Sequence, residues 1–365
     1  MESLNSSGQN FTEQIVVNNE FVVFSEKYSQ YHGYISSFIC FFGVVSNILN
    51  IIVLTRKHMI SPTNLILTAL ALADVMTMSV YLVYALYLYV FTLPRDTYGH
   101  SKGWMYFVVV NNLVVITCHN MAMWLTVSLA VFRYIFVCHH VVANQLCSLE
   151  RAKLTIGIVV VVTILLCIPN YFMYRVYELA EYQPNYTGYW IDLSLFAQSH
   201  SLYQPITFWI YGVIIKIAPC VLLTILSACI ICAMHEASKR RQRLLQQAGR
   251  HNEETSAEHN RTTMMLVAVV LFFVITEFPQ GILAGISGLN QNFFQTVYSN
   301  LGDIMDLLVL LNSAINFILY CIMSQQFRDT FTNLFVCNFI SLRNVHSAKQ
   351  NGMAYSTVKT EVTQV

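Results

Sequence analysis

Charged side chains are scarce in this sequence. Asp, Glu, Lys and Arg make up 11% of the 365 residues, whereas roughly a quarter is usual in soluble proteins. Hydrophobic residues make up 56%, and the mean hydropathy is +0.53. The net charge of +1 gives no indication of a nucleic-acid or acidic partner. A chain with so few polar side chains must keep most of its surface in lipid, which excludes an ordinary soluble protein.

Familiar catalytic motifs are also absent. The sequence has no HExxH pair, no GxSxG nucleophile turn and no P-loop. Residues 298–322 contain no lysine that could hold a retinal Schiff base, and no channel filter or ring of charge is evident. We therefore expect neither an enzyme nor a bound cofactor or metal.

The apolar part of the chain divides into seven segments, each long enough to cross a bilayer at ~20 residues per crossing. Because these segments are continuously apolar, they are typical of helices and not of membrane strands. The sequence predicts an all-α protein with a bundle over residues 34–323. The expected helices are 34–55, 63–91, 104–138, 154–174, 205–236, 262–287 and 298–322.

Basic residues predict the orientation of this bundle. They gather in one set of short loops, and Lys and Arg mark the cytoplasmic side. The N-terminal tail, 1–33, is then extracellular. Three glycosylation sequons fall on the same outer side, at Asn5, Asn10 and Asn185.

The cysteines do not form a disulfide framework. Most of the ten lie inside the apolar segments and the others lie in cytoplasmic ones, so none falls in an outer loop. We expect no disulfide.

After the last helix, residues 324–337 predict an amphipathic helix on the inner leaflet, with Phe327 and Phe331 on its apolar face. Cys337 is either a palmitoylation site or a free thiol. Residues 338–365 form a cytoplasmic tail. Its end, with Thr363 and Val365, fits a PDZ-binding motif of a kind that also arises by chance.

Polar residues at bilayer depth are costly and therefore informative. Asp74 stands alone in LILTALALADVMTM, and Asn47, Asn312 and Asn316 lie at similar depth. They form either a hydrated switch or a hydrogen-bond network that only joins helices. Pro219 and Pro279 interrupt two helices and predict kinks.

Acids also lie in the outer half of the bundle. Asp303 and Asp306 are three residues apart and share a helix face, and Glu277 lies in an uncharged run from 262 to 302. These acids suit a cationic ligand, although Lys216 is a second candidate partner for Glu277. Other candidate ligand-binding residues are Asn112, His119, Tyr84 and Tyr87, although aromatic belts at membrane interfaces also explain tyrosines.

These features meet in a family resemblance. Residues 61–74 (SPTNLILTALALAD), 124–134 (WLTVSLAVFRY), 260–282 and 302–328 are similar to rhodopsin-like G-protein-coupled receptors. Within that class they most resemble invertebrate receptors for myosuppressin and FMRFamide-like peptides. Positions that match the class pattern are Asn47, Asp74, Arg133, Tyr134, Pro219, Pro279, Asn316 and Tyr320.

The resemblance implies a receptor for a peptide ending in Arg-Phe-amide, with the arginine bound by Asp306, Asp303 or Glu277. It also implies signalling through heterotrimeric G proteins, of the Gi/o type, with arrestin as a further partner. Some positions depart from the class pattern: Phe132 replaces an acid, Phe317 a proline and Glu277 a tryptophan. The alternative is a transporter or channel that uses the buried acids as an ion path.

Overall fold

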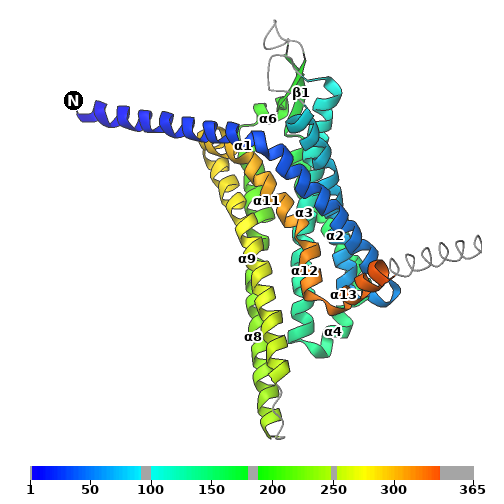
Figure 1. Cartoon of the computed structure of the whole chain (residues 1–365). Helices are drawn as coiled ribbons and strands as arrows, with labels where there is room; N and C mark the ends of the chain where they lie inside the picture. Colours follow the sequence, from blue (N-terminus) through cyan, green and yellow to red (C-terminus); the bar gives the residue numbers. More distant parts are fainter. Residues whose placement is uncertain (1, 92–99, 180–187, 248–252, 338–365) are drawn as a thin grey trace, which may run out of the picture.

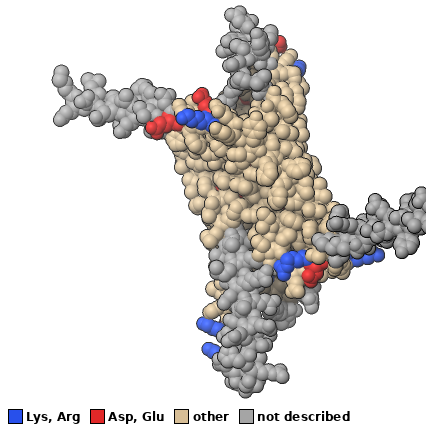
Figure 2. All heavy atoms as spheres, viewed as in Figure 1, with Lys and Arg blue, Asp and Glu red and all other residues tan. Residues whose placement is uncertain are grey.

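Long helices dominate the computed structural model, which describes residues 2–91, 100–179, 188–247 and 253–337 (Figure 1). Within those ranges, seven helices are long and apolar enough to cross a membrane. They are Glu20–Leu54, Pro62–Phe91, Lys102–Cys138, Leu149–Tyr171, Tyr203–Arg240, Val270–Leu289 and Phe294–Leu319. Figure 2 shows charged side chains at the two ends of the molecule and an uncharged band between them. The predicted seven-helix membrane fold is confirmed.

Several of these spans combine more than one helical element. The first three are α1 (Glu2–Leu54), α2 (Pro62–Ala85) with the π-helical η2 (Leu86–Phe91), and α3 (Lys102–Cys138). The next are α5 (Leu149–Tyr171), then α7 (Tyr203–Trp209) with the π-helical η4 (Ile210–Ile217) and α8 (Ala218–Gln247). The last are α9 (Glu253–Leu289), then η5 (Phe294–Tyr298), η6 (Ser299–Leu301), α11 (Gly302–Ala314) and α12 (Asn316–Met323). Short helices lie between the spans: η1 (Lys57–Met59), α4 (His140–Leu146), α6 (Leu195–Ser199) and α10 (Gln291–Phe293).

Serine side chains begin several helices. The Ser61 hydroxyl accepts the Asn64 N–H at 3.1 Å, with Pro62 at the first helical position. Ser148 caps α5, and Ser324 caps helix α13 (Gln325–Phe331), in the same way. Each cap satisfies an amide that has no partner inside the helix, so the helix starts are specified locally.

The first helix extends beyond the predicted boundary at residue 34. Helix α1 begins at Glu2, and its N-terminal part runs away from the bundle (Figure 1). No proline precedes Pro62, so the sequence permits a continuous helix through this stretch. The predicted extracellular tail is therefore helical, and its last turns pack on the bundle at His32.

A short hairpin covers one end of the bundle, in a loop where no strand was predicted. Strands β1 (Tyr174–Glu178) and β2 (Tyr189–Leu193) pair antiparallel, with Tyr174 opposite Leu193. Gly188 lies just before β2 with φ 127°, a backbone conformation that favours glycine. The Tyr189 N–H donates to His100 O at 3.0 Å, which ties the hairpin to the start of α3. We call this end of the molecule the hairpin end.

At the opposite end, helix α13 (Gln325–Phe331) and the π-helical η7 (Thr332–Cys337) follow the last span. Phe327 is 1% exposed and belongs to a core that includes Leu54, Met59 and Phe132. Phe331, Leu334 and Phe335 pack against the same core. The apolar face of this helix thus contacts the bundle, and its contact with a lipid leaflet stays a prediction.

Candidate functional site

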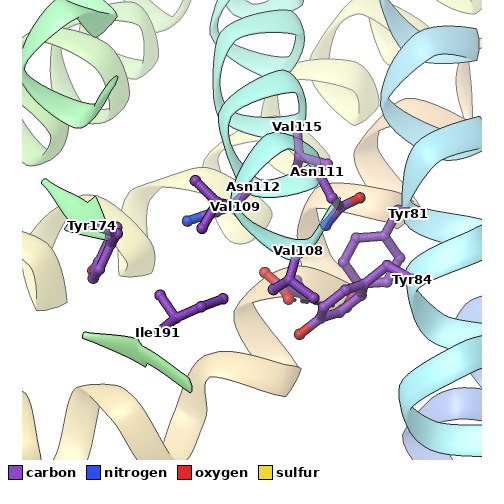
Figure 3. Close-up of a pocket in the computed structure, with 10 residues that line it drawn as sticks. Tyr81, Tyr84, Val108, Val109, Asn111, Asn112, Val115, Tyr174 and Ile191 are labelled. Carbon is purple, nitrogen blue, oxygen red and sulfur yellow. Dashed lines mark hydrogen bonds between the residues drawn. The ribbon is translucent and has the colours of Figure 1, made fainter. Parts of the chain in front are cut away.

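A cavity of about 230 Å³ lies beneath the hairpin (Figure 3). Helices α2 and α3 form two of its walls, the hairpin covers it, and α11 contributes an acid. Its lining is Tyr81, Tyr84, Val108, Val109, Asn111, Asn112, Val115, Tyr174, Ile191 and Asp306. Of the predicted ligand-binding residues, the cavity therefore brings together Tyr84, Asn112 and Asp306.

Tyrosine hydroxyls hold both acids at this end. The Tyr81 hydroxyl donates to Asp306 Oδ2 at 2.9 Å, and the Tyr89 hydroxyl donates to Asp303 Oδ1 at 2.7 Å. The Tyr84 ring lies between these two, 5.3 Å from Tyr81 and 6.1 Å from Tyr89. We call Tyr81, Tyr84, Tyr89, Asp303 and Asp306 the tyrosine–acid cluster.

The charge of Asp306 has no basic partner in its cavity. None of the described residues that line the cavity is Lys or Arg, and Asp306 accepts its hydrogen bond from the neutral phenol of Tyr81. Tyr174 adds no charge either, because burial raises its phenol pKa and the nearby Asp192 raises it further. A hydroxyl supplies one hydrogen bond but no compensating charge. This arrangement leaves Asp306 able to bind a cation.

A second acid lies deeper, in a buried triad formed by His119, Lys216 and Glu277. Lys216 Nζ lies 2.6 Å from Glu277 Oε2 and 2.9 Å from His119 Nε2. Lys216 and Glu277 are 0% exposed, and His119 is 2% exposed. Glu277 thus carries its own countercharge inside the protein.

The protons of the buried triad follow from the chemistry of its atoms. An ammonium nitrogen has no lone pair, so His119 Nε2 must accept a hydrogen bond from Lys216. The same Nε2 therefore carries no proton for Glu277, which lies 3.2 Å away. Within the described residues, Glu277 Oε1 and His119 Nδ1 have no hydrogen-bond partner.

Backbone irregularities place Lys216 against Glu277. Lys216 lies in the π-helical η4, next to Pro219, which cannot donate to the carbonyl four residues earlier. Glycines then let η4 approach α9. A Cβ on Gly281 would lie 3.0 Å from Gly212 O and 3.0 Å from Lys216 Cβ, so Gly281 is required for this close packing.

The predicted polar cluster lies at the middle of the bundle. Asn316 Nδ2 donates to Asp74 Oδ2 at 2.7 Å, and Asn47 Nδ2 donates to Ser313 O at 3.0 Å. Asp74 and Asn47 are buried, and Asn312 is half-buried on α11. These bonds join α1, α2, α11 and α12, which agrees with either of the predicted roles.

Other predicted residues lie elsewhere. Arg133 and Tyr134 are half-buried near the end of α3, with the Tyr134 ring 5.5 Å from His139. Pro219 is buried and Pro279 is exposed within α9. Asn185, Thr363 and Val365 lie outside the described residues, and the side chains of Asn5, Asn10, Tyr320 and Cys337 are not described.

Four predicted ligand-binding residues lie apart from the cavity lining. Glu277 and His119 are sealed in the triad, because Lys216 occupies the position expected for a ligand cation. Tyr87 stacks on Trp104 with ring centroids 3.6 Å apart, and Asp303 binds Tyr89. Asn111, beside Asn112 on α3, also lines the cavity and is 4% exposed.

The fold and this site define a class. A bundle of seven membrane-crossing helices with a cavity under a hairpin at one end is the architecture of a seven-transmembrane receptor. The chain belongs to the serpentine-type 7TM GPCR chemoreceptor Srw family, whose model matches residues 34–338. It is therefore a G-protein-coupled receptor and a multi-pass plasma membrane protein, in a family of receptors and not of enzymes.

Curated relatives agree with this assignment. The chain is 30% identical over 378 residues to the G-protein coupled receptor dmsr-1 of Caenorhabditis elegans, covering 91% of this chain and 74% of that one. It is 26% identical over 344 residues to the sex peptide receptor of Drosophila melanogaster, covering 90% and 76%. It is also 25% identical over 298 residues to the Drosophila FMRFamide receptor, covering 80% and 51%.

Proposed function

We propose that this chain is a receptor for an amidated neuropeptide of the FMRFamide or myosuppressin type. The peptide enters at the hairpin end, which faces the extracellular space, and a cationic side chain near its C-terminus binds Asp306. The relatives support a peptide ligand, since one is named a sex peptide receptor and another an FMRFamide receptor.

One observation carries the assignment of Asp306. Asp306 borders a cavity and has a neutral hydrogen-bond partner, whereas Glu277 is already bound to Lys216. A ligand arginine would gain a charge-assisted hydrogen bond at Asp306 without displacing a cation of the protein.

The proposed signalling step takes place at the opposite end of the bundle. Peptide binding shifts α9 about Pro279 and opens the α13 end, where Arg133 and the basic part of α8 contact a heterotrimeric G protein of the Gi/o class. Arrestin is the second expected partner there, and the C-terminal tail with Thr363 and Val365 is a candidate PDZ ligand. The peptide must bind the open state more tightly than the closed one for this shift to occur.

The test is a dose response to FMRFamide in cells that express the receptor, read as cAMP inhibition and G-protein dissociation. Asp306→Asn should raise the half-maximal concentration tenfold or more, because a hydrogen bond to a charged group contributes ~1.5–3 kcal/mol. Asp303→Asn is the matched control, since Asp303 does not line the cavity and should change the response less than Asp306→Asn does. An unchanged response of Asp306→Asn at equal surface expression would contradict the proposal.

A further inference from the structure

A histidine from α1 is buried against the tyrosine–acid cluster. His32 is 0% exposed, although its sequence position is in the segment predicted to be an extracellular tail. Its neighbour Gly33 lets α1 approach η2 closely, since a Cβ on Gly33 would overlap the side chain of Tyr89. The helix extension thus brings an imidazole to the ligand site.

His32 contacts both tyrosines that hold the acids. His32 Nε2 lies 2.9 Å from the Tyr81 hydroxyl, which in turn donates to Asp306 Oδ2 at 2.9 Å. The His32 ring also lies 4.9 Å from the Tyr89 ring, edge to face, and Tyr89 binds Asp303. His32 is therefore one contact away from each acid.

The direction of this hydrogen-bond chain is fixed by the acid. An ionised carboxylate only accepts hydrogen bonds, so the Tyr81 proton points to Asp306. The Tyr81 oxygen must then accept a proton from His32, which places the imidazole hydrogen on Nε2. If the Tyr81 hydroxyl rotated away from Asp306 and toward His32, its O–H would face the Nε2–H of His32, and two donors would oppose each other.

We propose that His32 is a positioning residue of the ligand site: its Nε2–H holds the Tyr81 hydroxyl in the orientation that aims Asp306 at a cationic ligand group. This inference rests on the proposed function, because it assigns a role in the same site. It makes the last turns of the α1 extension part of the binding machinery, although His32 itself does not line the cavity.

The test uses two substitutions that differ in reach. The glutamine amide N–H reaches the place of Nε2, while the asparagine amide reaches only the place of Nδ1. His32→Gln should keep the half-maximal concentration of FMRFamide within about twofold, and His32→Asn should raise it about fivefold to tenfold, the effect of roughly one hydrogen bond. An equal loss in both variants would overturn the proposal.

A double-mutant cycle separates positioning from general packing. Tyr81→Phe should weaken the FMRFamide response, and His32→Asn should add less than twofold in the Tyr81→Phe background. For a peptide analogue with neutral citrulline in place of arginine, His32→Asn should change the half-maximal concentration less than twofold. Additive losses, or equal losses for both peptides, would show a merely structural role.

The same cycle is also measured without ligand, as thermal unfolding of the purified receptor. The shifts in unfolding temperature from His32→Asn and Tyr81→Phe should be non-additive, and His32→Gln should keep the wild-type unfolding temperature. Additive shifts would show that His32 does not hold Tyr81. If the wild-type receptor does not respond to FMRFamide at all, the proposed function fails, and the thermal cycle still decides whether His32 holds Tyr81.

Discussion

Two acids of this receptor carry the same charge in opposite surroundings. Glu277 is fully buried, 2.6 Å from the Lys216 ammonium, while Asp306 borders a cavity and is held by a tyrosine hydroxyl. A buried charge is costly unless a countercharge and hydrogen bonds offset its desolvation. Glu277 is therefore neutralised inside the protein, whereas we propose that Asp306 binds the ligand.

The two acids also lie in different parts of the bundle. The tyrosine–acid cluster joins α2, η2 and α11 at the hairpin end, and His32 connects it to α1. The buried triad joins α3, η4 and α9. We therefore propose that selectivity for a cation and stability of the bundle depend on different acids.

The largest expected effect comes from breaking the Lys216–Glu277 ion pair. Lys216→Met leaves Glu277 as an uncompensated buried charge, which should destabilise the receptor by ~3–5 kcal/mol. The measurement is surface expression together with thermal unfolding of the solubilised protein. Adding Glu277→Leu should recover most of the loss, whereas a double variant as unstable as the single one would contradict this account of the pair.

A smaller effect should follow from separating η4 and α9, which carry Lys216 and Glu277. Gly281→Ala puts a Cβ 2.8 Å from Ile217 Cγ1 and 3.0 Å from Gly212 O, which should cost ~1–3 kcal/mol of stability. Gly285→Ala is the control, because a Cβ there meets nothing within 4 Å. Equal unfolding temperatures for both variants would show that the close approach of η4 and α9 is unimportant.

The smallest effect should come from placing a cationic side chain beside Asp306. Asn112→Lys places an ammonium in the same cavity as Asp306, so FMRFamide should lose about tenfold in potency, equivalent to ~1.4 kcal/mol. Its citrulline analogue should lose less. Asn112→Gln keeps an uncharged amide and serves as the control, and a loss as large in that variant would point to steric exclusion instead.

Hydropathy and loop charges predicted the seven helices, because a bilayer constrains each span separately. The same reasoning found Asp306, Glu277 and Lys216, since isolated charges are visible in apolar runs. His32 and the hairpin were missed, and nothing in the sequence set Tyr81 apart from the neighbouring tyrosines. Their roles depend on how α1, α2 and the loop after α5 meet, and a histidine in a polar stretch gives no sign that it will be buried.

The central claim is that Asp306, and not Glu277, recognises the cation of the ligand. The most direct measurement is the ratio of binding affinities for FMRFamide and its citrulline analogue, in membranes that carry the wild type, Asp306→Asn or Glu277→Gln. We predict that Asp306→Asn brings the ratio close to one, while Glu277→Gln keeps the wild-type ratio even where it weakens both peptides. A ratio that collapses in Glu277→Gln and persists in Asp306→Asn would contradict the account.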